Sequence, residues 1–405
     1  MTHKPARPIS RRLFLRSASL IGCSAAAWPL LSPVTFASAP GDERLVVIIL
    51  RGAMDGLDVV RPIGDPDYAT YRKPSLTDGK TGPALNDFYA LHPAMSDLMP
   101  LWTAGELGFA HAVATPYRDK RSHFDGQDIL EAGTGLDVLE PQVRDGWLNR
   151  MLQAVPDLKS DTAYAVGRDE MKVIEGPAPS MSWAPKTRLR ISDQSQRLLE
   201  RVYEEDPLFH AAAQEALEIS ARLEAEKTAE KNGMARLPKI KGQGAELAAF
   251  AAARLREDTR IATFSIGGWD THRNQRNVLA GRLSDLSGAI LALKSGLGRD
   301  WSKTTVLAMT EFGRTARENG TAGSDHGTGG ALIMAGGAIR GGQVYGKWPG
   351  LADHALFEQR DLMPTADVRA YAAWAMRGMF GFEKSLLETT VFPRLDMGDD
   401  PRIIA

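Results

Sequence analysis

The chain has 405 residues, of which 43% are hydrophobic and 24% are charged, and its formal net charge is −1. This composition is typical of a globular protein and excludes a disordered or collagen-like chain. Proteins that bind nucleic acids usually carry a basic surface, and this near-neutral balance gives no reason to expect a nucleic-acid partner.

The N-terminal segment predicts an export signal. Residues 10–16 (SRRLFLR) match the twin-arginine pattern, in which paired arginines precede apolar residues and a further basic residue. An apolar segment rich in Ala and Ser follows at residues 17–31, and residues 37–39 (ASA) fit a small-x-small cleavage site. We therefore expect residues 1–39 to be a twin-arginine signal peptide and the mature protein to be periplasmic. The alternative is an ordinary amphipathic N-terminal helix.

The single cysteine, Cys23, lies inside this expected signal peptide, so the mature chain has no cysteine for a disulfide. Residues 20–23 (LIGC) resemble a lipobox, and acylation of Cys23 would make the protein a lipoprotein. The lipoprotein is the less favoured alternative because the apolar segment continues past Cys23 to Leu31. No charge-free apolar run of about eighteen residues follows the expected signal peptide, so we expect no transmembrane span in the mature chain.

Short apolar segments of the mature chain predict a mostly parallel sheet. Residues 45–50 (LVVIIL) form a continuous aliphatic run, which is typical of a strand buried on both faces. Apolar residues recur at spacings of three and four over residues 279–297 and predict a helix that packs on the sheet. Alternating strands and helices predict a doubly wound α/β domain that spans residues 40–405. The other candidate strands are residues 107–113, 163–166, 260–266, 305–309 and 331–335, and residues 366–379 predict another helix.

Residues 189–249 differ from the rest of the chain because they are charged and helical in pattern. We interpret them as a helical insertion at the edge of the main fold. A solvated helical hairpin is the favoured form of this insertion, and a cap over a functional site is the alternative.

Ionisable residues collect in the loops at the ends of the candidate strands. The carboxyl ends of parallel strands share one edge of a sheet, where α/β proteins bind ligands, so residues scattered in the sequence should converge there. Carboxylate oxygens and imidazole nitrogens bind zinc or manganese, and the mature chain offers no thiolate. The sequence therefore predicts a site for one or two divalent ions. Its candidate ligands are Asp55, Asp270, His272, Glu311, Asp325 and His326.

Each candidate also has a structural interpretation. Asp55 could cap a helix. Asp270 and His272 could hydrogen-bond to each other, and Asp325 with His326 could form a turn. The metal hypothesis depends on all the clusters meeting in one place.

Ser122 is the candidate nucleophile. It precedes residues 123–132, which predict a helix, and the free N–H groups at a helix N-terminus favour an anion. A plain N-cap serine is the structural alternative. His123 is a second candidate catalytic residue because it adjoins Ser122. Arg314 or Arg121 could hold the free oxygens of an anionic substrate in a planar fork.

Six strings resemble one family, the uncharacterised bacterial family DUF1501. They are LRGAMDGLD (50–58), RSHFDGQDILEAGTG (121–135), RDGWLNRML (144–152), GGWDTH (267–272), TEFGRT (310–315) and SDHGTGGALIMAGG (324–337). The similarity runs from about Leu45 to Pro393. Members are typically exported by the twin-arginine pathway and are grouped with the alkaline-phosphatase and sulfatase superfamily. The resemblance therefore implies an alkaline-phosphatase-like α/β fold.

The superfamily resemblance also implies roles for the candidate residues. Asp55 is similar to the first-strand aspartate that bridges two metals, and Ser122 stands where the superfamily nucleophile opens its helix. The Asp-x-His spacing of Asp270 and His272 is closer than the usual Asp-x-x-x-His, which leaves the number of metals open. The remaining matches are Asp325 and His326, which resemble an Asp-His-Gly element, and Glu311, which stands for an earlier acidic ligand.

From these features we expect an exported, metal-dependent hydrolase or transferase that acts on small anionic phosphate or sulfate esters. The alternative is a non-catalytic periplasmic protein that has kept the fold and binds a metal or another ligand.

Overall fold

The aliphatic run near residue 45 forms β2 (Arg44–Arg51), an interior strand of the sheet. Its side chains alternate between two cores, with Val46, Ile48 and Leu50 on one face and Leu45, Val47 and Ile49 on the other. Burial on both faces explains why this strand reads as a continuous apolar run. The computed structural model describes residues 34–37, 41–73, 79–118, 120–135, 145–154, 171–178, 180–183 and 242–405.

The centre of the sheet is parallel. β2 pairs in parallel with β7 (Ile261–Gly267) on one side and with β8 (Thr304–Met309) on the other. β9 (Gly330–Ala335) is antiparallel to β8 and to β5 (Leu107–Ala114), so β5 runs in the same direction as β2. The strand order is β10-β5-β9-β8-β2-β7-β1-β6. The outer strands are β1 (Val34–Ala37), β6 (Met181–Trp183), β10 (Val344–Tyr345) and β11 (Ala366–Asp367).

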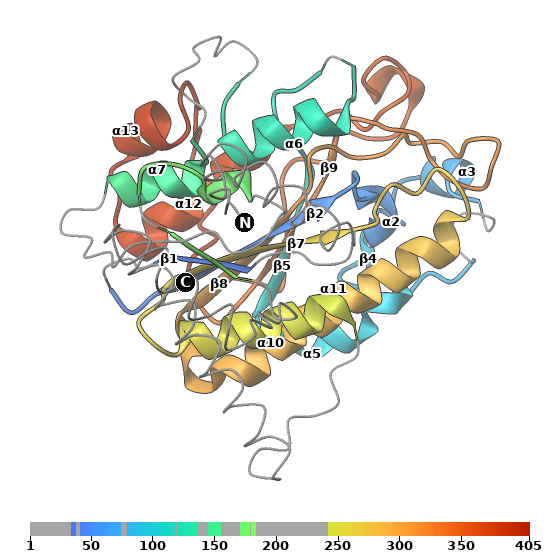
Figure 1. Ribbon diagram of the computed structural model, residues 1–405. Coiled ribbons are helices and arrows are strands. Elements are labelled where there is room, and N and C mark those ends of the chain that lie inside the picture. Colours follow the sequence, from blue (N-terminus) through green and yellow to red (C-terminus); the bar gives the residue numbers. More distant parts are fainter. Residues whose placement is uncertain are drawn as a thin grey trace, which may run out of the picture.

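Helices cover both faces of this sheet, which gives three layers (Figure 1). Apolar residues of α7 and α12 join one core, and those of α10 and α11 join the other. The helices are α2 (Gly56–Val59), α3 (Tyr68–Tyr71), α5 (Met99–Thr103), α6 (His123–Ala132), α7 (Trp147–Gln153), α10 (Gln243–Leu255), α11 (Gln275–Leu297), α12 (Val368–Phe380) and α13 (Lys384–Leu386). Short 3₁₀ or π turns lie at Pro93–Leu98, Lys172–Ile174, Gly298–Lys303, Asp353–Ala355 and Leu387–Val391, and β3 (Val60–Arg61) pairs with β4 (Ala90–Leu91).

The fold places several loops at one edge of the sheet. The segments after β2, β7 and β8 leave from the carboxyl ends of parallel strands. β9 runs in the opposite direction, so its first residue lies at this same edge. The whole segment between β8 and β9 therefore stays at the edge where the candidate ligands were expected.

Most predicted elements are present. The predicted strand at residues 163–166 and most of the predicted insertion lie outside the described residues. Residues 243–249, the end of the predicted insertion, belong to α10, whose Leu247 and Ala248 are buried in the main core. Val34–Ala37, within the expected signal peptide, form β1, which pairs with β6 and β7. Among the described helices, none has the length and apolarity to span a membrane.

Candidate functional site

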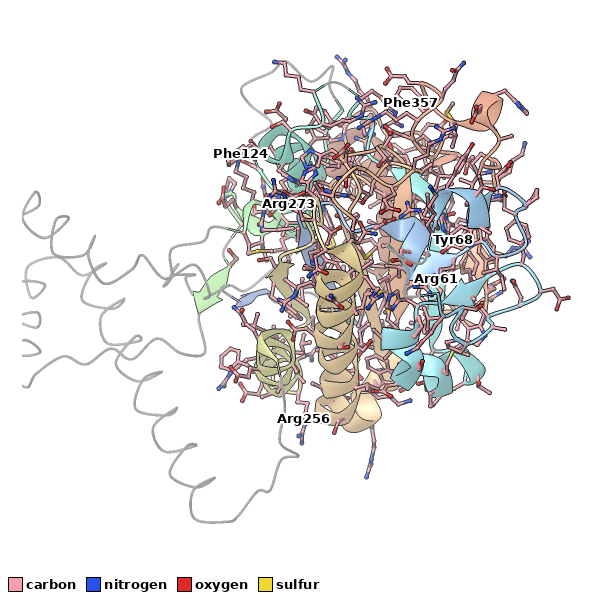
Figure 2. All side chains as sticks on the ribbon, turned by 90° about the vertical axis from the view of Figure 1, so that its right-hand side faces the viewer. Arg61, Tyr68, Phe124, Arg256, Arg273 and Phe357 are labelled. Atoms are coloured by element: carbon pink, nitrogen blue, oxygen red, sulfur yellow. The ribbon has the colours of Figure 1, made fainter. Side chains whose placement is uncertain are left out.

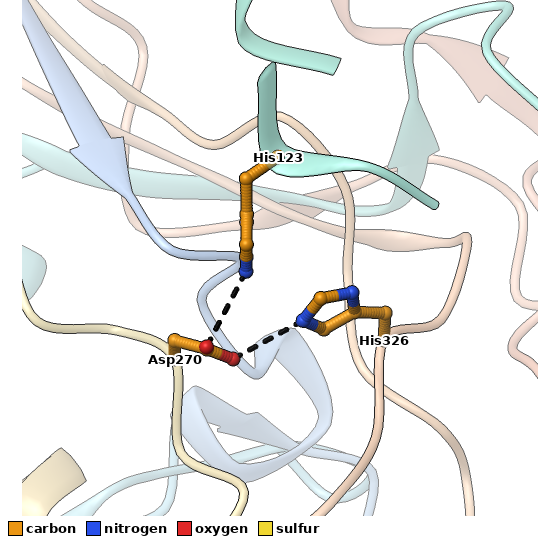
Figure 3. Close-up of side chains that lie close together, drawn as sticks. All are labelled: His123, Asp270 and His326. Carbon is orange, nitrogen blue, oxygen red and sulfur yellow. Dashed lines mark hydrogen bonds and ion pairs between the residues drawn. The ribbon is translucent and has the colours of Figure 1, made fainter. Parts of the chain in front are cut away.

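Three side chains from distant parts of the chain meet at the sheet edge (Figure 3). His123 opens α6, Asp270 follows β7 and His326 precedes β9. One potential ligand atom from each residue lies within 4.8 Å of the others. The segments that carry these three residues therefore converge at this edge.

His272 adds a fourth donor to this cluster. Its Nε2 lies 3.0 Å from Asp270 Oδ1 and 3.0 Å from His326 Nε2. His326 Nε2 is 3.2 Å from Asp270 Oδ1, and His123 Nε2 is 3.5 Å from Asp270 Oδ2. Ligands bound tetrahedrally at about 2.0–2.1 Å from an ion are about 3.3 Å apart. Each of these contacts has about the spacing of two ligands on one ion, and the residues whose ligand atoms all lie within 4.8 Å of one another are His123, Asp270 and His326.

The second ring nitrogen of each imidazole contacts an acceptor outside the cluster. Nδ1 of His123 lies 2.8 Å from Glu311 Oε1, and Nδ1 of His272 lies 3.1 Å from Asp325 Oδ1. Nδ1 of His326 lies 2.8 Å from the carbonyl oxygen of Arg121. These acceptors favour a proton on Nδ1, which leaves the Nε2 lone pair free to bind a cation.

This assignment explains why a cation fits the cluster. With Nδ1 protonated, neutral His272 and His326 face each other through two Nε2 lone pairs at 3.0 Å. Such a contact is repulsive without a positive charge between the nitrogens. Burial lowers the pKa of His326, whereas the hydrogen bond to Glu311 raises the pKa of His123. A divalent ion satisfies the lone pairs without protonating a ring.

Glu311 lies beneath His123 rather than in the cluster. Its carboxylate is fully buried and accepts hydrogen bonds from Gly52 N (2.9 Å) and Gln127 Nε2 (3.1 Å), besides the contact with His123. Burial tends to raise the pKa of Glu311, but these hydrogen bonds outweigh it and the pKa is lowered. Glu311 therefore stays ionised and orients the His123 ring, which also stacks on Phe312 at 5.3 Å between ring centroids.

Asp270 is held by Arg314. The buried guanidinium donates from Nη1 to Asp270 Oδ1 (2.7 Å) and from Nε to Ser324 Oγ (3.2 Å). Burial tends to raise the pKa of Asp270, but Arg314 outweighs it, so the pKa is lowered. Arg314 thus fixes a carboxylate of the cluster, instead of facing solvent as an anion clamp would. Arg121 is also engaged, with Glu358 (2.6 Å) and Asp361 (3.1 Å).

Asp325 orients a ligand in the same way as Glu311. Its Oδ1 accepts from Asn319 Nδ2 at 3.1 Å and contacts His272 Nδ1. The hydrogen bond from Asn319, followed by the contact with His272, lowers the pKa of Asp325. An ionised Asp325 therefore holds the His272 ring from outside the cluster.

Asp55 is separate from the four converging donors. Its buried carboxylate pairs with Arg72, and its Oδ2 accepts from Gln275 Nε2 at 2.6 Å. Gln275 Oε1 in turn accepts from Ser324 Oγ at 2.5 Å, and Ser324 contacts Arg314. Asp55 is thus linked to Asp270 through a buried hydrogen-bond network, but the charge of Arg72 already neutralises its carboxylate.

Ser122 is the N-cap of α6. Its Oγ accepts from Asp125 N at 3.4 Å, and its backbone N–H donates to the hydroxyl of Tyr117 at 2.9 Å. The N-cap interpretation is therefore confirmed, and the role of nucleophile stays a prediction. Ser122 is only half-buried, and Phe124, two residues further along α6, is 84% exposed (Figure 2). Solvent can therefore reach this end of the helix.

The sequence did not single out two residues of the supporting network, Gln275 and Arg72. Gln275 and Arg72 are buried polar side chains on different helical segments. Gln275 follows the GGWDTH string closely and opens α11, which is the one signal that could have drawn attention to it. Arg72 follows α3 and carries no comparable signal.

The cluster of His123, Asp270 and His326 lies at a place that solvent reaches. The side chains of Asp270 and His272 are 43% and 41% exposed, so water reaches both of them. No curated protein and no solved structure matches the chain. A family model does match residues 42–372, which is most of the chain. The chain therefore belongs to the family described as protein of unknown function (DUF1501).

Proposed function

We propose that the protein binds one divalent metal ion through His123, Asp270, His272 and His326 and uses it to hydrolyse or transfer phosphate or sulfate esters. One observation carries the metal site: ligand atoms of His123, Asp270 and His326 lie within 4.8 Å of one another, and His272 Nε2 lies 3.0 Å from both Asp270 Oδ1 and His326 Nε2. The opposite nitrogen of each imidazole contacts a fixed acceptor, an arrangement that typically accompanies histidines bound to a metal.

The donor set favours zinc or manganese. Imidazole suits zinc, and carboxylate oxygen suits both zinc and the harder manganese ion. A single ion is proposed because Asp55, the expected bridge to a second ion, is neutralised by Arg72. The proposed number of ions, one, thus depends on Arg72, which lies outside the sequence motifs.

The chemistry of such an ion is to polarise an ester oxygen and to lower the pKa of a bound hydroxyl group or water. Around it, Glu311 and Asp325 hold two imidazoles in position, and Arg314 holds Asp270. Ser122 is the proposed nucleophile because it adjoins His123 in sequence and lies at the N-terminus of α6. The free N–H groups of that helix end favour an anionic substrate group.

The resemblance to the alkaline-phosphatase and sulfatase superfamily supports the ester substrate. The motifs that contain Asp270, His272 and His326 resemble metal-ligand motifs of that superfamily, and these residues lie at the edge of a mostly parallel sheet. We propose an alkaline-phosphatase-like fold on the same basis. Asp55, Glu311 and Asp325 depart from the implied ligand set, because each contacts a protein group instead of joining the four converging donors.

The second candidate function is non-catalytic metal binding. Four protein ligands fill a tetrahedral zinc site, and closed sites of this type are usually structural. The hydroxyl of Ser122 is already used as a helix cap. These two observations favour a binding protein over an enzyme if the ion is zinc with no further ligand.

We also propose that the protein is exported to the periplasm by the twin-arginine pathway, on the basis of residues 10–16. Replacing Arg11 and Arg12 by Lys should keep the protein in the cytoplasm. Normal export of that double variant would contradict the proposal.

The two functions differ in one experiment. The purified protein is loaded with zinc or manganese, and its turnover of an aryl phosphate and an aryl sulfate is measured with and without a chelator. Metal-dependent turnover that is lost in Asp270→Asn supports the hydrolase. Bound metal without turnover of either ester supports the binding protein, and absence of bound metal overturns both.

A further inference from the structure

A second site lies at the opposite edge of the sheet from the metal cluster. β9 begins near His326, and the segment beyond its far end contains Arg340. There, a cavity of about 440 Å³ opens between α12 and the C-terminal segment. It is lined by Arg340, Trp374, Arg377, Gly378, Asp400, Arg402, Ile404 and Ala405.

The cavity is formed by α12 and by the C-terminal segment, which lies close to this helix. Trp374, Arg377 and Gly378 are spaced by three and four residues, so they share one face of α12. A Cβ atom at Gly378 would lie 2.8 Å from Ile404, so glycine lets the C-terminal segment approach the helix closely. That segment is tied to the end of β9 because Arg340 N donates to Ile403 O at 2.8 Å.

Arginine is the commonest charged residue of the lining. Three guanidinium groups face a single carboxylate side chain, that of Asp400. Arg377 is held by the carbonyl of Phe382 at 2.8 Å, and its Nη1 lies 3.7 Å from Glu383 Oε2.

Two of these guanidinium groups lack a partner. Within the described part of the chain, those of Arg340 and Arg402 make no hydrogen bond or ion pair, and both residues are exposed. Arginines gathered at one cavity repel each other, and an anion between them would relieve that repulsion. Their planar forks match phosphate and carboxylate oxygens.

Trp374 supplies a rigid wall. Its indole Nε1 donates to Met397 O at 2.9 Å, which fixes the ring, and Lys384 Nζ lies 5.8 Å from the ring centroid. The wall is therefore aromatic and has a further cation nearby. A cavity of this volume is within the range of about 300–1,000 Å³ that is typical of small-molecule sites.

We propose that this cavity binds a small organic polyanion, a molecule with at least two phosphate or carboxylate groups, through Arg340 and Arg402. The site is independent of the metal centre and of any ester chemistry there. Its position at the opposite edge of the sheet makes it a separate binding function.

Isothermal titration calorimetry of the purified protein tests this proposal, with inorganic pyrophosphate and citrate as probes of phosphate and carboxylate groups. Both probes also bind metal ions, so the titrations use Asp270→Asn, which should lack the proposed ion. We expect saturable binding of at least one probe with one site per chain. Which probe binds more tightly identifies the anionic group.

Two double variants are compared, and each removes two positive charges, one pair inside the cavity and one pair outside it. Arg340→Ala with Arg402→Ala should weaken binding at least tenfold. Arg256→Ala with Arg299→Ala, which removes the same charge from exposed positions outside the cavity, should change it less than twofold (Figure 2 labels Arg256). Arg340→Gln alone provides a milder variant, and unchanged thermal unfolding shows that each variant folds. No saturable binding of either probe, or an equal loss in both double variants, would overturn the proposal.

Discussion

In each imidazole ring of the cluster, Nδ1 contacts an acceptor oxygen of the protein and Nε2 lies near Asp270. Glu311 faces His123, Asp325 faces His272 and the Arg121 carbonyl faces His326. Arg121 itself adopts a left-handed conformation with φ of 52°, an uncommon value for a non-glycine residue. The backbone before α6 is thus set in a conformation that lets its carbonyl reach His326.

The role of Glu311 can be tested at the level of a single atom. Glu311→Gln keeps the shape and an acceptor oxygen but removes the charge that holds His123 in its metal-binding orientation. We expect metal affinity to fall by about 10–100-fold, as is typical for outer partners of metal-bound histidines. Competition with a chelator measures this change. Glu383→Gln, which alters an 81% exposed carboxylate, is the control, and equal affinity in the two variants would show that Glu311 has no such role.

A second residue, His111, predicts how stability depends on pH. It is buried on β5, its Nε2 donates to Val60 O at 2.8 Å, and its Nδ1 accepts from Ala112 N at 2.9 Å. Burial lowers the pKa of His111 to about 4. Between pH 6.5, its ordinary pKa, and pH 4, the unfolded chain binds more protons at this residue than the folded chain does. His111 therefore makes the protein less stable as the pH falls through this range.

Asp58 makes the protein more stable as the pH falls, which is opposite to the effect of His111. A variant of His111 is therefore needed to separate the two contributions. Burial raises the pKa of Asp58 to about 6, and the folded state gains stability as Asp58 is protonated. His111→Gln removes only the first contribution. Relative to wild type, its free energy of unfolding should rise by about 3 kcal/mol between pH 7 and pH 4. Urea denaturation at several pH values measures this difference, and a difference that does not change with pH would contradict the assignment.

At the scale of elements, α6 combines structure and site. Ser122 caps the helix, His123 is its first residue and Gly133, with φ of 65°, ends it. The helix boundaries match residues 123–132 as predicted from the sequence, because the cap serine and the final glycine mark both ends. The N-cap position and the candidate nucleophile are the same residue, so a single substitution would alter both.

Two substitutions separate these roles. Ser122→Ala should cost about 1 kcal/mol of stability, whereas Ser122→Gly should cost only a few tenths, because glycine is tolerated at the N-cap. Both should leave metal content unchanged, and both should remove turnover if the hydroxyl is the nucleophile. Denaturant unfolding, metal analysis and an aryl ester assay provide the three readings. Turnover retained in either variant would leave Ser122 as a cap alone.

The sequence predicted the edge of the sheet where the cluster lies, but it did not predict which partners the candidate carboxylates contact. Hydrophobic patterns located β2, β5, β7, β8 and β9, and strand ends in an α/β sheet indicate the ligand edge. The contacts of Asp55 and Glu311 could not be predicted, because they depend on partners from other segments. Arg72 neutralises one carboxylate and His123 contacts the other, and no spacing rule relates those pairs.

At the scale of the whole molecule, the sheet separates two polar regions. The cluster of His123, Asp270 and His326 lies at the edge formed by the ends of β2, β7 and β8, and the arginine-lined cavity lies beyond the far end of β9. Helices lie over both faces of the sheet (Figure 1), and an apolar core is buried on each face. This rigid three-layer body explains how side chains from distant segments are held within a few ångströms of each other.

The central claim is a single metal ion held by three histidines and Asp270. Anomalous X-ray diffraction at the zinc or manganese edge, from crystals of the protein grown with that metal, tests it most directly. The account predicts one anomalous peak per chain, about 2.0–2.2 Å from Asp270 and from the Nε2 atoms of His123, His272 and His326. A peak bound by Asp55, or no peak between the three imidazoles in metal-loaded crystals, would contradict it.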